Sequence, residues 1–134
     1  MAELKTLVVD DEPVSRRLMQ IILNTFGTCA AVGSGKEAIG VFRESIETGD
    51  FFDLVTLDVS MPGIDGTKVL MIIRELERES GLDRERPAKV LMVTAHSDQR
   101  IVKTSIMAGC DGYIVKPYTK DIIVDKLKQL GLAG

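Results

Sequence analysis

The sequence predicts an α/β protein in which a doubly wound, five-stranded parallel sheet is flanked by five helices. Two observations support this prediction. Short apolar runs rich in β-branched residues alternate five times with segments of helical spacing, the pattern of repeated strand–helix units. The strongest runs are continuously apolar rather than alternating, which indicates strands buried on both faces by covering helices. The 134 residues are enough for one such domain.

The strands are predicted at residues 4–9, 28–32, 53–57, 90–94 and 113–115, and the helices at 13–26, 36–47, 67–80, 98–108 and 121–130.

Local signals support the elements in the first half of the chain. Pro13 suits the first turn of the first helix. Ser34 and Glu37 have the spacing of a capping box at the start of the second helix, whose apolar residues fall on one stripe. The second strand is the weakest of the five.

The second half carries similar signals. Asp65-Gly66 is typical of a turn before the third helix. Ser97 and Thr119 can cap the fourth and fifth helices. No linker, repeat or low-complexity tract interrupts the pattern, so we expect residues 1–134 to form a single domain with no attached output domain.

Composition and charge exclude several classes of function. The net charge is −3 and acidic and basic residues are interspersed, so no positive field is expected to attract a nucleic acid backbone. The longest apolar stretches are far shorter than the roughly 20 residues that cross a bilayer, and the N-terminus lacks the apolar segment of a signal peptide. We therefore expect a cytoplasmic protein with no direct DNA binding and no membrane association.

Cysteine and histidine chemistry is also disfavoured. Cys29 and Cys110 form no CxxC pair, and two thiols in a reducing compartment are more often small core residues than a disulfide or a metal site. His96 is the only histidine, so neither a histidine-rich zinc site nor a two-histidine iron site can form. Chemistry that depends on histidine is therefore nearly excluded.

Acids, a hydroxyl and an amine are predicted to converge at one edge of the sheet. The first strand is followed by Asp10 and Asp11, the third by Asp58, the fourth ends in Thr94, and the fifth is followed by Lys116. Ligands of open parallel sheets bind beyond these carboxyl ends. Each residue alone has a structural explanation, such as a helix cap or a turn. Together the carboxylates repel one another unless a cation neutralises them.

Magnesium fits these side chains. Mg²⁺ takes oxygen ligands, commonly one or two carboxylates plus phosphate oxygens, and Asp11 and Asp58 can supply the carboxylates. An aspartate is a competent nucleophile for forming an aspartyl phosphate. Lys116 would balance the remaining charge, and Thr94 could donate its hydroxyl to a phosphate oxygen. The sequence thus predicts a Mg²⁺-dependent phosphorylation of Asp58 that moves the loop after the fourth strand.

The sequence resembles the receiver domain of two-component response regulators, in its CheY-like, single-domain form. The motifs that carry the resemblance are, in order, Val8-Val9-Asp10-Asp11-Glu12, Leu57-Asp58-Val59-Ser60-Met61-Pro62-Gly63-Ile64-Asp65-Gly66, Val93-Thr94-Ala95 and Tyr113-Ile114-Val115-Lys116-Pro117. The resemblance implies a flavodoxin-like sheet with strand order 2-1-3-4-5. It also implies that Asp58 is the phosphoacceptor and that Asp10, Asp11, Asp58 and the backbone carbonyl of Ser60 form the Mg²⁺ site.

The resemblance further implies a switch. Thr94 and Lys116 would contact the phosphoryl group as catalytic residues together with Asp58. Tyr113 would turn inward as Thr94 moves towards the phosphate, and the Lys116-Pro117 bond is expected to be cis. The positions expected to modulate the attack of water on the acyl phosphate are Ser60, Ala95 and His96.

Partners are also implied by the resemblance. The donor would be a phosphohistidine on a sensor histidine kinase or a histidine phosphotransfer protein. No separate substrate is consumed, so the protein is expected to be no enzyme beyond catalysing its own phosphorylation and dephosphorylation. Phosphorylation would change the surface of the fourth helix, fifth strand and fifth helix, where an unidentified partner protein would contact Thr104, Met107 and Tyr113.

A different class of function is suggested by Gly33-Ser34-Gly35-Lys36-Glu37-Ala38. This segment follows a strand, opens a helix and fits the GxGxxA form of the dinucleotide fingerprint, with Asp58 about 20 residues further on. The fingerprint normally occupies the first strand–helix turn, where this chain has an acidic pair that would repel a pyrophosphate. A dinucleotide module would bind NAD without metal, whereas a receiver would bind Mg²⁺ and react with a phosphodonor. A phosphorylation-independent interaction domain would do neither.

Overall fold

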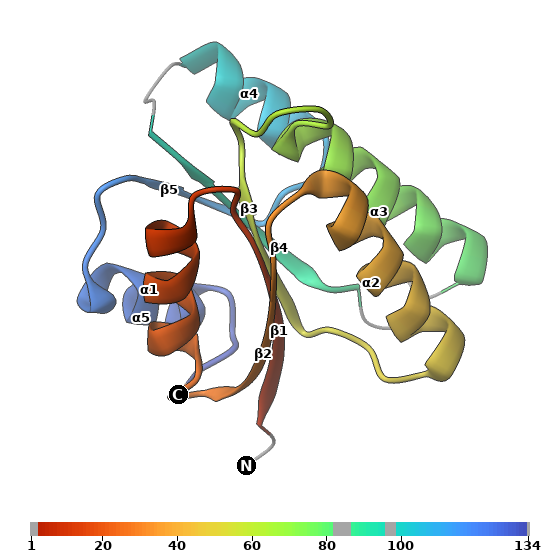
Figure 1. The fold of residues 1–134 in the computed structure, drawn as a ribbon, viewed down its shortest axis with the longest axis horizontal. Helices are drawn as coiled ribbons and strands as arrows, with labels where there is room; N and C mark the ends of the chain where they lie inside the picture. Colours follow the sequence, from red (N-terminus) through yellow and green to blue (C-terminus); the bar gives the residue numbers. More distant parts are fainter. Residues whose placement is uncertain (1–2, 82–86, 96–98, 134) are drawn as a thin grey trace.

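The computed structural model describes residues 3–81, 87–95 and 99–133 (Figure 1). Strands and helices alternate there in the predicted order. The strands are β1 (Leu4–Val9), β2 (Gly27–Val32), β3 (Leu54–Asp58), β4 (Lys89–Thr94) and β5 (Gly112–Val115). The helices are α1 (Pro13–Leu23), α2 (Gly35–Thr48), α3 (Gly66–Ser80), α4 (Gln99–Met107) and α5 (Lys120–Gln129). Each predicted element is therefore present.

The strands form one parallel sheet in the order β2-β1-β3-β4-β5. Val9 of β1 pairs with Val32 of β2 on one side and with Leu57 of β3 on the other. The predicted fold class and strand order are thus confirmed. The strand order reverses between β1 and β3, the point where ligands of such sheets bind. Asp10 and Asp58 lie at the carboxyl ends of these two strands.

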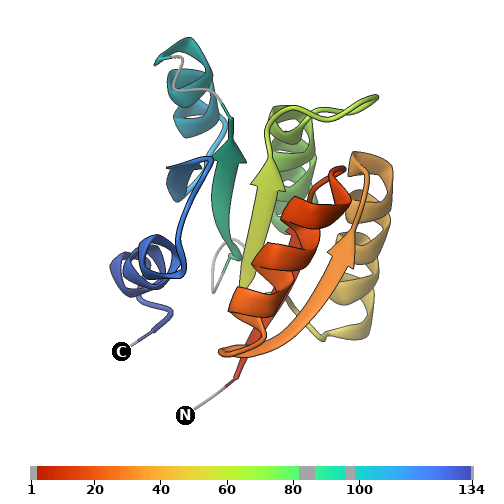
Figure 2. The same ribbon diagram turned by 60° about the vertical axis from the view of Figure 1, so that its left-hand side comes forward.

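Helices cover both faces of the sheet. α1 and α5 lie on one face, and α2, α3 and α4 lie on the other (Figures 1 and 2). Leu23 of α1 and Leu127 of α5 are buried in one apolar cluster. Phe42 of α2 and Leu70 and Ile73 of α3 are buried in the other. Each such side chain contributes about 1.5–3 kcal/mol through its burial, so the two clusters hold the three layers together.

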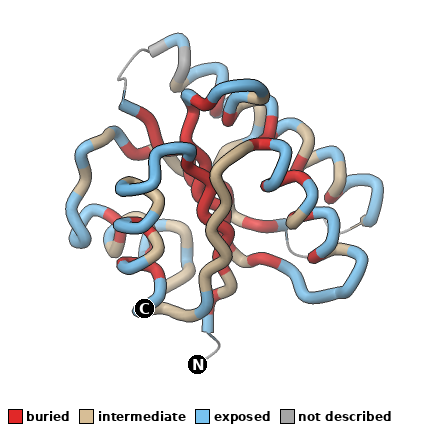
Figure 3. The backbone as a smooth tube through the Cα atoms, viewed as in Figure 1, coloured by how far each residue is buried: buried red, intermediate tan, exposed pale blue. Residues whose placement is uncertain are grey.

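Burial follows the position of each strand in the sheet (Figure 3). All of β3 is buried, and β1 and β4 are buried except for one half-buried residue each. This confirms the interpretation of the continuous apolar runs. β2 lies at the edge and is mostly half-buried, which is the physical reason for its weaker apolar pattern.

Some helix ends differ from the predictions. α1 ends at Leu23 rather than at Phe26. The chain turns there, and the Phe26 carbonyl then accepts a hydrogen bond of 3.0 Å from the backbone N–H of Leu4. The segment that leads into β2 pairs with the start of β1, so α1 ends earlier than predicted. The predicted cap Ser97 lies outside the described residues.

Side chains cap the N-termini of α1, α2, α3 and α5. Ser34 and Thr119 cap α2 and α5, as predicted. Asp65 caps α3 by accepting a hydrogen bond from the backbone N–H of Lys68 at 2.9 Å, so the expected turn is also the helix cap. The cap of α1 is Glu12 and not Asp11, whose carboxylate is thereby left to the site.

Candidate functional site

Three carboxylates converge where β1 and β3 end. Asp10 follows β1, and Asp58 occupies the last position of β3. Both are only 6% exposed, whereas the neighbouring Asp11 is exposed. One carboxylate oxygen from each of the three residues lies within 4.8 Å of the other two. The structure therefore brings together the acids that the sequence places at this edge.

Lys116 lies beside two of these acids. Its Nζ donates hydrogen bonds to Asp10 Oδ2 at 3.0 Å and to Asp58 Oδ2 at 3.4 Å. The lysine follows β5 and is anchored by its backbone N–H, which donates to the Thr94 carbonyl at 2.7 Å. The Lys116-Pro117 bond is cis, as expected. The ammonium group offsets part of the repulsion between the carboxylates.

Backbone N–H groups hold the other oxygens of the two buried carboxylates. Glu12 donates to Asp10 Oδ1 at 2.9 Å, and Ser60 donates to Asp58 Oδ1 at 3.1 Å. Each buried acid thus has one oxygen on the backbone and the other on Lys116. The carboxylates are oriented by the fold before a ligand binds.

Burial and the neighbouring charges together shift the pKa values of Asp58 and Lys116. Burial raises the pKa of Asp58 from 3.8 to about 6; Lys116 opposes this shift, while the charge of Asp10 adds to it. Burial also disfavours the charged form of Lys116, but its contacts with Asp10 and Asp58 raise the pKa of the lysine overall. At neutral pH the site therefore presents an ionised Asp58 beside a protonated Lys116.

Glycine allows α3 to begin directly against the end of β3. A Cβ at Gly66 would lie 2.2 Å from the backbone oxygen of Asp58. The Gly66 N–H also donates to the Val59 carbonyl at 3.0 Å. The β3–α3 loop is therefore folded tightly around the residue after the strand.

The glycines of the dinucleotide-like segment have packing roles. A Cβ at Gly35 would lie 2.7 Å from Val69 Cγ2 and 2.8 Å from the Ile64 carbonyl oxygen, so glycine lets α2 start against the β3–α3 loop and α3. A Cβ at Gly33 would lie 2.9 Å from Arg16 Nη1. Close approach of neighbouring segments explains this spacing without a bound pyrophosphate.

The remaining predicted site residues that the structure describes lie on β4 and β5 or directly after β3 and β4. Thr94 is buried at the end of β4, and Tyr113 of β5 is half-buried against the cluster on the α2 and α3 face. β4 and β5 are adjacent, which places these two residues on paired strands. Ser60 and Ala95 are exposed. His96 lies outside the described residues.

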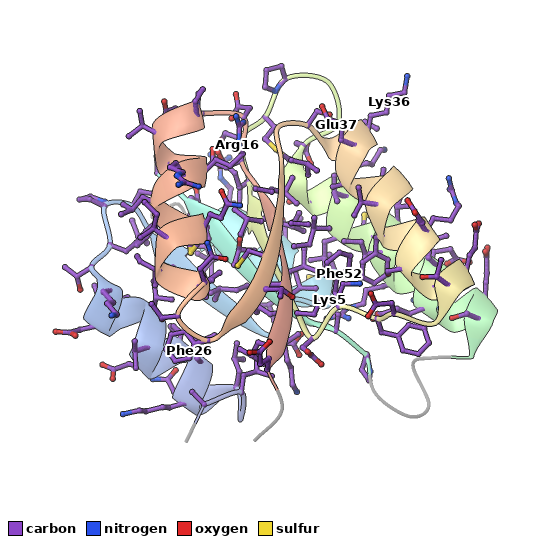
Figure 4. The ribbon with its side chains drawn as sticks, turned by 60° about the horizontal axis from the view of Figure 1, so that its bottom comes forward. Lys5, Arg16, Phe26, Lys36, Glu37 and Phe52 are labelled. Atoms are coloured by element: carbon purple, nitrogen blue, oxygen red, sulfur yellow. The ribbon has the colours of Figure 1, made fainter. Side chains whose placement is uncertain are left out.

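One side chain that the sequence did not single out also contacts the site. Arg16 of α1 donates from Nη1 to the backbone carbonyl of Asp10 at 3.0 Å. Figure 4 shows Arg16 on the part of α1 near the connection between β2 and α2. No motif marks this residue, and the contact depends on how the first turn of α1 folds back over the loop that follows β1.

The chemistry of the donors fits a hard divalent cation. The three carboxylates offer oxygen ligands, which Mg²⁺ prefers, and one buried pair supplies the negative charge that attracts it. Within the described residues this is the only such group of three acidic, histidine or cysteine ligands. No helix in the described part of the chain has the length and apolar character needed to cross a membrane.

The fold and the acidic edge define a class of protein. A parallel 2-1-3-4-5 sheet carries an acidic pair after β1, an aspartate at the end of β3, a threonine at the end of β4 and a lysine after β5. The family model for the response regulator receiver domain matches residues 6–128. The chain belongs to this family, the receiver domains of two-component signalling systems.

Curated relatives include chemotaxis proteins of similar length. Chemotaxis protein CheY of Pseudomonas aeruginosa is 33% identical over 129 residues, with 95% of this chain and 95% of that protein covered. Chemotaxis protein CheY of Bacillus subtilis is 29% identical over 127 residues, with 93% of this chain and 95% of that protein covered.

Solved structures agree with this assignment. A chain of the CheX–CheY–BeF3–Mg²⁺ complex from Borrelia burgdorferi matches with a TM-score of 0.79 and 26% identity, covering 96% of this chain and 89% of that one. In that complex a CheY protein is found together with CheX, BeF3 and Mg²⁺.

Proposed function

We propose that this receiver domain is a phosphorylation switch in which Asp58 accepts a phosphoryl group in a Mg²⁺-dependent reaction. The observation that carries the proposal is the setting of Asp58. Its carboxylate is buried at the carboxyl edge of the sheet, 3.4 Å from Lys116 Nζ and beside two further carboxylates. The donor is a phosphohistidine on a sensor histidine kinase or a histidine phosphotransfer protein, in keeping with the family.

Asp58 acts as the nucleophile. A carboxylate oxygen attacks the phosphorus and forms a P–O bond, while the P–N bond of the donor breaks and its electron pair leaves with the imidazole. The pKa of about 6 keeps Asp58 ionised at neutral pH. The N–H of Ser60 and the ammonium of Lys116 orient the carboxylate for this attack. The chain thus catalyses only its own modification, and no separate substrate is consumed.

Asp10, Asp11 and Asp58, with the backbone carbonyl of Ser60, are the residues that would hold Mg²⁺. The spacing of the three carboxylates supports this ligand set. When bound, Mg²⁺ offsets the negative charge on the phosphoryl oxygens. Lys116 adds a second positive charge from the β5 side.

Thr94 and Tyr113 change position in response to the negative charge of the phosphoryl group. The Thr94 hydroxyl donates to a phosphoryl oxygen, which draws the end of β4 towards Asp58. Tyr113, on the paired strand, turns inward into the space that this movement leaves. A hydrogen bond to a charged group contributes about 1.5–3 kcal/mol, which is enough to shift a two-state equilibrium tenfold or more.

The output surface is formed by α4, β5 and α5. Met107 is 79% exposed and Ile106 is 60% exposed on α4, so apolar side chains are available there for a partner protein. Thr104 lines a neighbouring groove of about 950 Å³ between α4, α3 and the β3–α3 loop. Ser60 and Ala95 are exposed next to Asp58 and Thr94, and together with His96, which lies outside the described residues, they are the positions proposed to set the access of water and hence the lifetime of the acyl phosphate.

Intact-mass measurement after incubation with a small-molecule phosphodonor tests the proposal. The wild-type chain should gain one phosphoryl group with Mg²⁺ and none in a chelator. Asp58→Asn, which keeps the shape of the side chain but removes the nucleophile, should gain none in either buffer. Because phosphorylation would have to occur elsewhere, a gain in Asp58→Asn rejects Asp58 as acceptor.

A folded wild-type chain that binds Mg²⁺ and still gains no mass would reject the switch. Titration with NAD in the absence of metal then tests the dinucleotide alternative. Binding of the isolated partner should differ between the phosphorylated and unmodified chains, and equal affinities would reject the output surface.

A further inference from the structure

We propose that Arg16 is a positioning residue for the metal end of the site, and that Gly33 provides the space in which its guanidinium lies. The inference rests on the proposed function in one respect, namely that Asp10 and Asp11 bind Mg²⁺. Arg16 acts through the backbone of this acidic pair and not on the phosphoryl group itself.

The guanidinium of Arg16 joins α1 to the loop that carries the acids. Its Nη1 donates a hydrogen bond of 3.0 Å to the backbone oxygen of Asp10. The backbone N–H of Arg16 also donates to the Glu12 carbonyl at 2.9 Å. Arg16 is half-buried, so the bond to Asp10 is partly shielded from water. The first turn of α1 and the acidic loop therefore form one connected unit.

The carbonyl that Arg16 holds belongs to the peptide between the two acids. Because a peptide is planar, fixing the oxygen of Asp10 also fixes the direction in which the chain enters Asp11. The other polar groups of Asp10 are held by Val32, Glu12 and Lys116. Asp11 is exposed, so packing contributes little to its orientation. The placement of its carboxylate therefore depends on the backbone that Arg16 holds.

Gly33 lies directly beside the guanidinium group of Arg16. A Cβ at this position would lie 2.9 Å from Arg16 Nη1, closer than an ordinary van der Waals contact. Gly33 has no positive φ, so alanine is compatible with its backbone and the conflict falls on the end of a flexible side chain. The first glycine of the dinucleotide-like segment thus makes room for an arginine at the phosphorylation site.

A positioning role of Arg16 and a simple effect of its charge predict opposite changes in Mg²⁺ affinity when the arginine is replaced. Removing a cation beside three carboxylates strengthens their attraction for Mg²⁺ by Coulomb's law. Removing the hydrogen bond that orients the Asp10-Asp11 peptide weakens Mg²⁺ binding instead. The direction of the change in Mg²⁺ affinity therefore distinguishes the two roles.

Calorimetric titration of the full chain with Mg²⁺ tests the role of Arg16. Arg17→Met is the matched control, because Arg17 is an exposed arginine on the same helix that bonds to Gln20. We expect Arg16→Met to raise the Kd for Mg²⁺ about threefold to tenfold, the range for one hydrogen bond, and Arg17→Met to leave it unchanged or lower it. At saturating Mg²⁺ the rate with a small phosphodonor should stay within about twofold of wild type, since the nucleophile keeps its contacts.

Gly33→Ala disturbs the hydrogen bond between Arg16 and the Asp10 carbonyl without changing the arginine itself. It keeps both arginines but displaces the guanidinium, so we expect a similar rise in the Kd. Gly40→Ala is its control, because a Cβ there meets no atom within 4 Å. The double variant Arg16→Met/Gly33→Ala should bind Mg²⁺ no more weakly than Arg16→Met, since both changes remove one interaction.

The outcomes separate this inference from the proposed function. A wild-type chain that binds Mg²⁺ and is phosphorylated, with an Arg16→Met Kd no higher than that of Arg17→Met, overturns the positioning role alone. Fully additive effects of Arg16→Met and Gly33→Ala overturn the role assigned to Gly33. A wild-type chain that binds no Mg²⁺ overturns both the proposed function and this inference.

Discussion

Asp58 carries a negative charge at a buried position. Its contacts with the fold offset only part of the free-energy cost of burying this charge. The ammonium of Lys116 and the N–H of Ser60 each contact one carboxylate oxygen, yet burial still raises the pKa to about 6. A buried carboxylate with a raised pKa destabilises the folded state whenever it is ionised. We therefore expect Asp58, the proposed nucleophile, to be a position at which the ionised side chain lowers the stability of the fold.

The substitution Asp58→Asn should stabilise the metal-free protein at pH 7.5. Folding raises the pKa of this carboxyl from 3.8 to about 6, so the native state binds a proton more tightly than the unfolded chain between these values. The cost of the charge is fully present above pH 6 and disappears as the pH falls towards 4. We expect a gain of about 1–3 kcal/mol at pH 7.5 that shrinks by pH 4.5.

Urea unfolding of both chains in a chelating buffer, over a series of pH values, measures this difference. Comparing the two chains at each pH cancels the contributions of the other titrating groups. A difference that is constant from pH 7.5 to 4.5 would contradict the raised pKa.

At the scale of elements, a partly buried ion-pair network joins α3 to the far end of the sheet. Arg74 of α3 lies 2.7 Å from Glu77 and 2.7 Å from Asp111, and it donates to the Gly109 carbonyl at 3.0 Å. Glu77 is fully buried, and its second oxygen accepts from the Ala88 N–H at 2.7 Å. The network therefore connects α3, the start of β4 and the segment between α4 and β5.

Arg74→Met should strongly destabilise the protein. The substitution leaves Glu77 buried without its cation, and removing one partner of a buried pair costs about 3–5 kcal/mol. Arg78→Met is the control, because Arg78 pairs with Glu75 on the same helix where both side chains are more than half exposed. This control should change the free energy of unfolding by less than about 1 kcal/mol. Equal losses in the two variants, measured by urea unfolding, would contradict the importance of the network.

A pair of glycines tests the packing of α3 against β3. Gly66→Ala places a Cβ 2.2 Å from the Asp58 backbone oxygen, so the backbone must move, and we expect a loss of about 1–3 kcal/mol. Gly40→Ala, in the interior of α2 with open space around it, should instead gain about 0.5–1 kcal/mol. Only Gly66→Ala should also slow phosphorylation of Asp58. Unchanged phosphorylation in a destabilised Gly66→Ala chain would show that the close approach serves stability alone.

At the scale of the whole molecule, Mg²⁺ binding should stabilise the fold. The carboxylates come from the ends of β1 and β3, so an ion bound between them is held only when these strands are paired. We expect a gain of about 2.7 kcal/mol at a Mg²⁺ concentration of 100 times the Kd. Asp11→Asn should lose most of this gain, whereas Asp125→Asn, an exposed acid of α5, should keep it.

Thermal unfolding with and without Mg²⁺ compares these chains. Since Asp11 is exposed, its substitution should leave the metal-free stability nearly unchanged. A full Mg²⁺ effect in Asp11→Asn would remove this residue from the ligand set.

The sequence by itself determined the class of fold and the residues that meet at the site. Alternation of apolar runs with helical segments reports burial and period, which depend on residues close together in the chain. In a parallel sheet the carboxyl ends of the strands necessarily share one edge, so Asp10, Asp58 and Lys116 could be placed together from the sequence alone. Their roles in phosphorylation remain predictions from the motifs.

The tertiary structure alone decided how these residues are held. The contact of Arg16 with the acidic loop, the space left by Gly33 and the network around Arg74 join residues that no local pattern connects. The early end of α1 and the choice of Glu12 as its cap likewise depend on how neighbouring segments meet. Periodicity and capping signals act over a few residues, whereas docking angles are set by the packing of the whole core.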